Sequence, residues 1–161
     1  MWVYKKNHAG VTSASYPELL SYLELYINFK LKVLDAKAIN LDADTAYKKE
    51  INGYENTLKA QKKVAAKNFE YAFIINEYRE GVLMFNISEK KIWNKVIENE
   101  KEIRDYYQKN IANYGWKNFE EVQGQVIADY QQELENEWIK GLRTKYVVKI
   151  NDDELKKLAK P

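Results

Sequence analysis

One predicted helix, within residues 15–42, constrains the fold most. Ser15 is followed three residues later by Glu18, which is typical of a capping box, and Pro17 lies in the first turn, where a missing N–H costs least. Apolar residues then recur at helical spacing. They are Leu19, Leu20, Leu23, Ile27, Leu31, Leu34 and Ala38, and the stripe is widened by Tyr22, Tyr26, Phe29, Val33 and Ala36. A helix that is apolar over most of its circumference is usually packed on several sides, so we expect the rest of the chain to cover it. The clearest polar strip on it consists of Glu18, Ser21, Glu24, Asn28, Lys32 and Asp35, with Lys30 and Lys37 beside it.

Several later segments also show helical spacing of apolar residues. A left-handed stop at Asn40 and a cap at Asp42 or Asp44 introduce the first of them. A second capping box, Asn118 with Glu121, introduces the longest. The predicted helices cover residues 47–58, 69–85, a short piece after a cap at Ser88, 99–111, 119–143 and a last short piece with Leu155 and Leu158. Residues 2–6 and 146–150 have the character of short strands.

The composition favours a single, mostly α domain over residues 1–161. Glycine (6) and proline (2) are scarce, which favours long helices over a sandwich or barrel. The 26 basic and 24 acidic residues nearly balance, which argues against a dedicated nucleic-acid binder. There is no cysteine, so disulfides, thiolate nucleophiles and cysteine-type metal sites are excluded.

The sequence also bears on the cellular compartment. No apolar run reaches the ~18–20 residues that a membrane-spanning helix needs, and no signal peptide opens the chain. The first residues look like the middle of a strand, so we expect a segment upstream of Met1. The absence of cysteine is compatible with a periplasmic protein.

Residues suited to bond chemistry are few. The single histidine, His8, lies in a predicted loop, where we expect it to be solvated, and no HExxH, P-loop or GxGxxG motif occurs. Asp129, Glu133 and Glu137 form an acidic row without histidine or a loop of oxygen ligands, which is typical of a solvated helix face rather than a metal site. The lysine-rich residues 59–68 favour a wet surface over a nucleic-acid site. We therefore predict no catalytic residue, no metal and no cofactor.

Aromatic residues are the unusual feature: 13 tyrosines, 4 tryptophans and 5 phenylalanines. A helical core accounts for most of them. Tyrosine and tryptophan also offer apolar area with a polar tip at low entropic cost, which suits a cleft that binds varied chains. The candidates for such a peptide-binding cleft are Tyr78, Trp93, Tyr107 and Trp116.

Four stretches, in order along the chain, carry a family resemblance: WVYKKN (2–7), YINFKLKVLDAKAINLDADTAYKKEINGY (26–54), NEYREGVLMFNISEKKIWNKV (76–96) and FEEVQGQVIADYQQELENEWIKGLRTKYVVKIN (119–151). Together they resemble SurA/PrsA-type peptidyl-prolyl isomerases in the multidomain form of Bacteroidetes. The resemblance implies a chaperone core in which N- and C-terminal helices pack together with a small pairing of strands. It implies binding of unfolded outer-membrane or secreted polypeptides in the periplasm.

One departure from that family is decisive for activity. Its members carry one or two parvulin domains between the second and third of these stretches, whereas here the connection is little more than residues 59–68, KAQKKVAAKN. The catalytic histidines and the cysteine or aspartate of parvulins have no counterpart in that short segment. The resemblance therefore implies the chaperone core without the isomerase, since an inserted domain enters and leaves at nearby points and a short bridge can rejoin its host.

We accordingly expect a non-enzymatic, ATP-independent chaperone core that binds extended polypeptides. Two alternatives stay open: a structural or engineered core without an activity of its own, and a residual peptidyl-prolyl isomerase. Residues 59–68 could also fuse two helices into one rod, which would favour a homodimer formed by segment exchange.

Overall fold

The computed structural model of the chain describes residues 2–8, 13–60 and 69–159, and their regular structure is entirely helical. The prediction of a mostly α fold is confirmed. The helices are α1 (Trp2–Asn7), α2 (Tyr16–Ala38), η1 (Leu41–Ala43), α3 (Thr45–Ala60), α4 (Phe69–Ser88), η2 (Glu89–Trp93), α5 (Asn94–Glu98), α6 (Glu100–Asn110), η3 (Ile111–Tyr114), α7 (Phe119–Lys145) and α8 (Asp152–Leu158).

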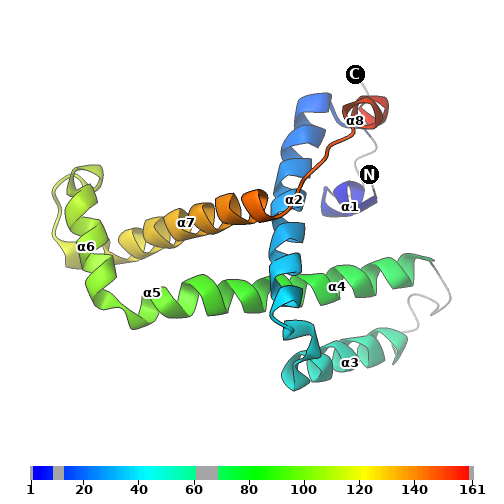
Figure 1. The fold of residues 1–161 in the computed structure, drawn as a ribbon, viewed down its shortest axis with the longest axis horizontal. Coiled ribbons are helices and arrows are strands. Elements are labelled where there is room, and N and C mark those ends of the chain that lie inside the picture. Colours follow the sequence, from blue (N-terminus) through cyan, green and yellow to red (C-terminus); the bar gives the residue numbers. More distant parts are fainter. Residues whose placement is uncertain (1, 9–12, 61–68, 160–161) are drawn as a thin grey trace.

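Helix α2 is the central helix, which α4, α7, α8 and η1 contact (Figure 1). The predicted capping interaction is present, because the Glu18 carboxylate accepts hydrogen bonds from the backbone N–H and the hydroxyl of Ser15 at 2.8 and 2.7 Å. The helix stops at the predicted left-handed residue, Asn40, whose φ is 58°. Asp44 then caps α3 by accepting from the backbone N–H of Ala46 at 2.7 Å. The local sequence signals thus set both ends of α2 and the start of α3.

The predicted strands are wrong. Residues 2–7 form helix α1, whose Tyr4 is buried against Leu19 and Leu155, and residues 147–150 follow α7 without regular structure. An extended segment becomes a strand only when a second one pairs with it, and within the described residues neither segment has such a partner. The C-terminal segment instead stays exposed, as Val147 shows at 86%.

Helices α3 and α4 pack side by side rather than forming one rod. The rings of Tyr54 and Tyr78 stack with centroids 3.7 Å apart, and the Tyr47 hydroxyl donates to the backbone carbonyl of Arg79 at 3.4 Å. Arg79 also pairs with Glu55. The possible fusion through residues 61–68 itself lies outside the described residues, but a continuous rod would have separated these side chains.

From α4 to α5 the backbone continues through one wide turn. The backbone N–H of Asn94 donates to the carbonyl of Glu89, five residues earlier, which makes η2 a π-helical turn. Ser88 is therefore not the predicted cap: its backbone is helical (φ −66°, ψ −44°), and its side chain is buried beside Met84. A π turn adds one residue to the helix and shifts the apolar phase, which explains why the sequence pattern appeared to restart there.

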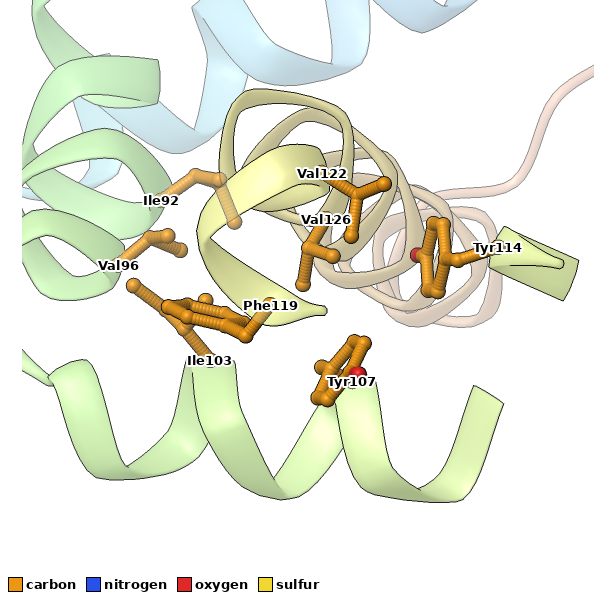
Figure 2. Packing of buried hydrophobic residues seen from close by; sticks show 8 residues of the cluster. All are labelled: Ile92, Val96, Ile103, Tyr107, Tyr114, Phe119, Val122 and Val126. Carbon is orange, nitrogen blue, oxygen red and sulfur yellow. The ribbon is translucent and has the colours of Figure 1, made fainter. Parts of the chain in front are cut away.

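The distal end of the molecule, formed by η2, α5, α6, η3 and the first half of α7, has its own apolar core (Figure 2). In that core the rings of Tyr107 and Phe119 meet edge to face at 5.4 Å, and the turn before α7 contains the left-handed Gly115 (φ 62°). The buried members are Ile92, Val96, Ile103, Tyr107, Tyr114, Phe119, Val122 and Val126.

The C-terminal third returns to α2, as the resemblance led us to expect. Helix α7 runs back from α6 to cross α2, and α8 lies beside the first turns of α2 (Figure 1). The Tyr16 hydroxyl donates to Asp152 at 3.0 Å, and Leu155 is buried against the start of α2. Helix α8 begins at Asp152, and Asn151 caps it by accepting from the backbone N–H of Glu154 at 3.2 Å.

The crossing of α2 and α7 is polar, because part of the polar strip of α2 faces α7 instead of solvent. Asp35 and Lys32 are only 5% and 7% exposed. The Asp35 carboxylate accepts from Lys91 at 2.5 Å and from the Trp138 indole N–H at 2.9 Å, and Lys145 lies 3.6 Å from its other oxygen. We call Asp35, Lys91, Trp138 and Lys145 the Asp35 network. Burial alone would raise the pKa of Asp35, but its hydrogen bonds from Lys91 and Trp138 outweigh burial and hold that pKa below its usual value.

Candidate functional site

A row of aromatic rings follows one face of α2. The Tyr22 ring stacks on Tyr26 at 6.4 Å, and Tyr26 stacks on Phe29 at 5.7 Å. Helix α1 extends the row, because the Tyr4 ring meets Tyr22 edge to face at 5.1 Å and His8 stacks on Tyr4 at 4.2 Å. The spacing of residues 22, 26 and 29 places these side chains on one face of a helix.

Three adjoining hollows open along these rings. The first, of about 410 Å³, lies between α1 and the start of α2 and includes Tyr4 and Tyr22. The second, of about 210 Å³, shares Tyr22 and Leu25 with the first and reaches Glu77 on α4. The third, of about 430 Å³, begins at Glu77. The apolar side chains of the three hollows form what we call the aromatic track: Tyr4, Tyr22, Leu25, Tyr26, Phe29, Tyr78, Val82 and Phe85.

Two carboxylates sit on the rim of the track, each held by a tyrosine. The Tyr26 hydroxyl donates to Glu77 at 3.1 Å, and the Tyr78 hydroxyl donates to Glu50 at 3.1 Å. Burial, and then the charge of Glu77, raises the pKa of Tyr26, while burial and the hydrogen bond to Glu50 raise the pKa of Tyr78. Both phenols are therefore protonated at neutral pH and act as donors.

The predicted cleft residues Tyr78 and Trp93 lie along the same continuous helix. Tyr78 lines the third hollow, as does Phe85, which is 52% exposed. The half-buried Trp93 meets the Phe85 ring edge to face at 4.9 Å. Phe85 thus connects two of the four side chains that the sequence singled out.

The other two predicted residues belong to the distal end. Tyr107 is buried, with its hydroxyl donating to the carbonyl of Lys117 at 2.7 Å, so it is a core residue and not part of a surface. Trp116 is 73% exposed, but it lies in the turn before α7 and lines none of the three hollows of the track. The four candidates therefore do not form one cleft.

The aromatic residues of α2 are the part of the site that sequence reasoning missed. The sequence pattern assigns Tyr22, Tyr26 and Phe29 to the wide apolar stripe of a packed helix. Their signal was their identity: three aromatic side chains at positions i, i+4 and i+7, two of them carrying a polar tip. Buried positions of the same helix, such as Leu31 and Val33, are aliphatic.

On the other side of Leu25, α2 and α7 enclose a polar crevice of about 650 Å³. Leu25 is 69% exposed and forms the ridge between this crevice and the aromatic track. Arg143 spans the crevice, donating to Asn28 at 2.7 Å and to Glu24 at 2.6 Å. We call it the amide crevice after Asn28, Gln132 and Asn136.

The remaining candidates for chemistry stay apart from one another. His8 donates from Nδ1 to the carbonyl of Tyr4 at 2.8 Å, and Asp129 accepts from the Tyr114 hydroxyl at 3.1 Å. Of the lysine cluster, Lys59 lies within the described part of the chain and approaches Glu55 at 3.8 Å. Among the described residues, no group of three histidine, aspartate or glutamate side chains is arranged to hold a metal ion. Nor does any described helix combine the length and apolar character needed to cross a membrane.

Comparison with known proteins adds no assignment. No family model matches the chain, and neither a curated protein nor a solved structure is significantly similar to it.

Proposed function

We propose that the chain is a non-enzymatic, ATP-independent chaperone core that binds unfolded or extended polypeptides, as the SurA-like sequence stretches suggest. The observation that supports this best is the aromatic track, an open surface of tyrosine, phenylalanine and aliphatic side chains that spans α1, α2 and α4. The resemblance also suggests the periplasm as its compartment and outer-membrane or secreted chains as its clients.

The shape of the track suits clients of varied sequence. Its three hollows are open rather than enclosed, and neighbouring hollows share lining residues, so an extended chain could contact more than one of them. Tyr22 and Tyr26 are half-buried, and their apolar ring area can contact a client without requiring one particular partner. A surface of this kind binds weakly, because each client loses conformational freedom on binding.

Holding a client would proceed without bond chemistry. While a client segment lies on the track, its apolar side chains are removed from water and from other unfolded chains, which lowers the concentration of aggregation-prone chain. Release would follow from the modest affinity, with folding of the client in the free state.

The direct test compares two surface substitutions on the track with a matched one elsewhere. Leu25→Ser and Phe85→Ser remove exposed apolar side chains from the track, and Ile97→Ser removes a similarly exposed side chain, 71%, from the distal end. We expect each track variant to bind an unfolded client about 3- to 10-fold more weakly and to suppress its aggregation less, because each loses roughly 1 kcal/mol of apolar contact.

Ile97→Ser should bind and protect clients as the unchanged protein does. Equal behaviour of all three variants would remove the track from the proposal. Failure of the unchanged protein both to suppress aggregation and to bind an extended peptide would contradict the chaperone function itself.

A further inference from the structure

We propose that the aromatic track selects extended segments in which lysine or arginine alternates with apolar residues. The inference rests on the proposed function and specifies its clients. It is drawn from the charged residues that line the track and those that line the amide crevice on the other side of Leu25.

The charged groups along the track are predominantly acidic. Glu18 lines the first hollow, Glu77 lines the second and third, and Glu50 lines the third. Among the described residues of these linings there is no lysine or arginine, although the chain as a whole carries 26 basic and 24 acidic residues. An apolar client that also carries positive charge therefore matches this surface better than a neutral one.

Glu77 and Glu50 are oriented to take up such a charge. Each accepts one hydrogen bond, from Tyr26 and Tyr78 respectively, through its Oε1 atom. An ionised carboxylate has several further acceptor sites, so each can pair with a client ammonium or guanidinium group. A tyrosine ring lies beside each carboxylate, but Tyr26 already stacks with Phe29 and Tyr78 with Tyr54, so the attraction of a client cation rests on the carboxylates.

The chain itself contains an example of this arrangement. Lys30 places its ammonium group 5.7 Å from the centroid of the Tyr26 ring while it pairs with Glu80 at 2.6 Å. A carboxylate and a tyrosine face thus hold a lysine at the edge of the track. A client lysine beside Glu77 would likewise meet a carboxylate next to the Tyr26 ring.

The opposite side of the Leu25 ridge has a different charge. The amide crevice contains Lys140, and its other charged lining residues are paired, Glu135 with Lys32 at 2.5 Å and Arg143 with Glu24 at 2.6 Å. A cationic segment is therefore favoured on the track and disfavoured in the crevice. We therefore expect the basic residues of a client to lie on the α4 side of Leu25.

Three peptides of equal length test the selection. Each repeats the same leucine and phenylalanine residues, and the alternate positions are all lysine, all glutamine or all glutamate. Fluorescence anisotropy of the labelled peptides with the full chain should give dissociation constants in the order lysine, glutamine, glutamate, from tightest to weakest. We expect the lysine peptide to bind about 3- to 10-fold more tightly than the glutamine peptide at low salt, and this ratio to fall as salt is added.

The double variant Glu50→Gln with Glu77→Gln should reduce the ratio to about one, because a glutamine carbonyl still accepts from tyrosine but carries no charge. The matched control is Glu98→Gln with Glu133→Gln, two exposed residues outside the track, and it should leave the ratio unchanged. Equal binding of the lysine and glutamine peptides, or an unchanged ratio in the Glu50/Glu77 variant, would overturn the selection while leaving the proposed function intact. Failure of all three peptides to bind would overturn the proposed function, and the selection with it.

Discussion

The distal end and the α2–α7 crossing are held together by different forces. At the distal end, the α6 and α7 helices meet through buried aromatic and aliphatic side chains such as Tyr107, Phe119 and Val126 (Figure 2). At the crossing, Asp35 of α2 joins Trp138 of α7 and Lys91 of η2 through charged hydrogen bonds. One interface is apolar and the other is ionic, although the same helix, α7, takes part in both.

The difference matters because the two kinds of interface respond to different conditions. Apolar burial is non-directional and nearly independent of pH and salt. A buried charge must be paired, and its pairing fixes the relative orientation of the helices that carry it. The crossing therefore sets the geometry beside Leu25 and the amide crevice, while the distal end supplies a rigid support for α7. Trp138 packs against the distal core and also against the cluster of buried residues around Val33 and Leu83, and so links the two.

The largest loss of stability is expected from a substitution in the apolar core of the distal end. Phe119→Ala removes a ring that is 5% exposed and lies against Tyr107, and it should lower the free energy of unfolding by about 3–5 kcal/mol, through lost burial and the cavity that remains. Urea denaturation measures the change. Its neighbour Trp116, which is 73% exposed, is the control, and Trp116→Ala should change stability by no more than about 0.5 kcal/mol. Similar losses in both variants would mean that burial does not distinguish these positions.

Substitution of Asp35 tests the ionic side. Asp35→Asn keeps the size of the side chain but leaves Lys91 and Lys145 without their carboxylate, and we expect a loss of about 1–3 kcal/mol at pH 7. Because the pKa of Asp35 is lowered in the folded state, the carboxylate contributes stability above its unfolded pKa of ~3.9 and loses that contribution as pH falls through the folded value.

The difference in stability between the unchanged protein and Asp35→Asn should therefore be constant from pH 5 to 7 and should shrink below about pH 4. The difference caused by Phe119→Ala should remain over the same range. A pH-independent effect of Asp35→Asn would show that the crossing is held by packing and not by charge.

Deletion of one residue tests the turn that connects the two regions. Removing the exposed Lys90 from the π turn restores an ordinary helix with both flanks in their present phase, so we expect a cost of no more than about 1 kcal/mol. Removing Lys95, just beyond the turn, rotates Val96 by about 100° relative to Ile92 and should cost about 2–4 kcal/mol, because both side chains lie in the distal core. Thermal unfolding of both variants gives the comparison. Equal losses of stability in the two variants would show that the π turn cannot absorb the deletion of a residue.

The smallest effect should come from the exposed edge of the crossing. Arg143→Gln removes the contacts to Glu24 and Asn28, and because the pair is partly solvated we expect a loss of about 0.2–1 kcal/mol. Salt should abolish this loss and leave that of Phe119→Ala in place, as denaturation with and without 1 M NaCl would show. A loss that persists at high salt would assign Arg143 a packing role.

Most helices of the fold were predictable because their signals are local. The Glu18 cap, the left-handed Asn40 and the Asp44 cap depend on a few neighbouring residues, and the sequence contains them in full. Ser88 failed as a cap because a serine at a phase change looks the same whether a helix starts or a π turn inserts one residue. The strands failed because strand formation depends on a distant partner that local pattern cannot supply.

The site was less predictable than the fold for a related reason. Helical spacing places Tyr22, Tyr26 and Phe29 on one face, but only the positions of α1 and α4 decide that this face remains partly open. Conversely, Tyr107 is also an aromatic residue at a helical position, but Phe119 and the turn before α7 cover it. Burial of Asp35 and Lys32 likewise depends on where α7 crosses, which is set by contacts more than a hundred residues apart along the chain.

The wide turn at residues 89–93 lets the two halves of one continuous helix pack against two different parts of the molecule. Contacts with α2 constrain the residues before the turn, and packing in the distal core constrains those after it. A substitution in one half therefore need not be matched by one in the other. The aromatic track could therefore change in sequence while the distal core stays unaltered.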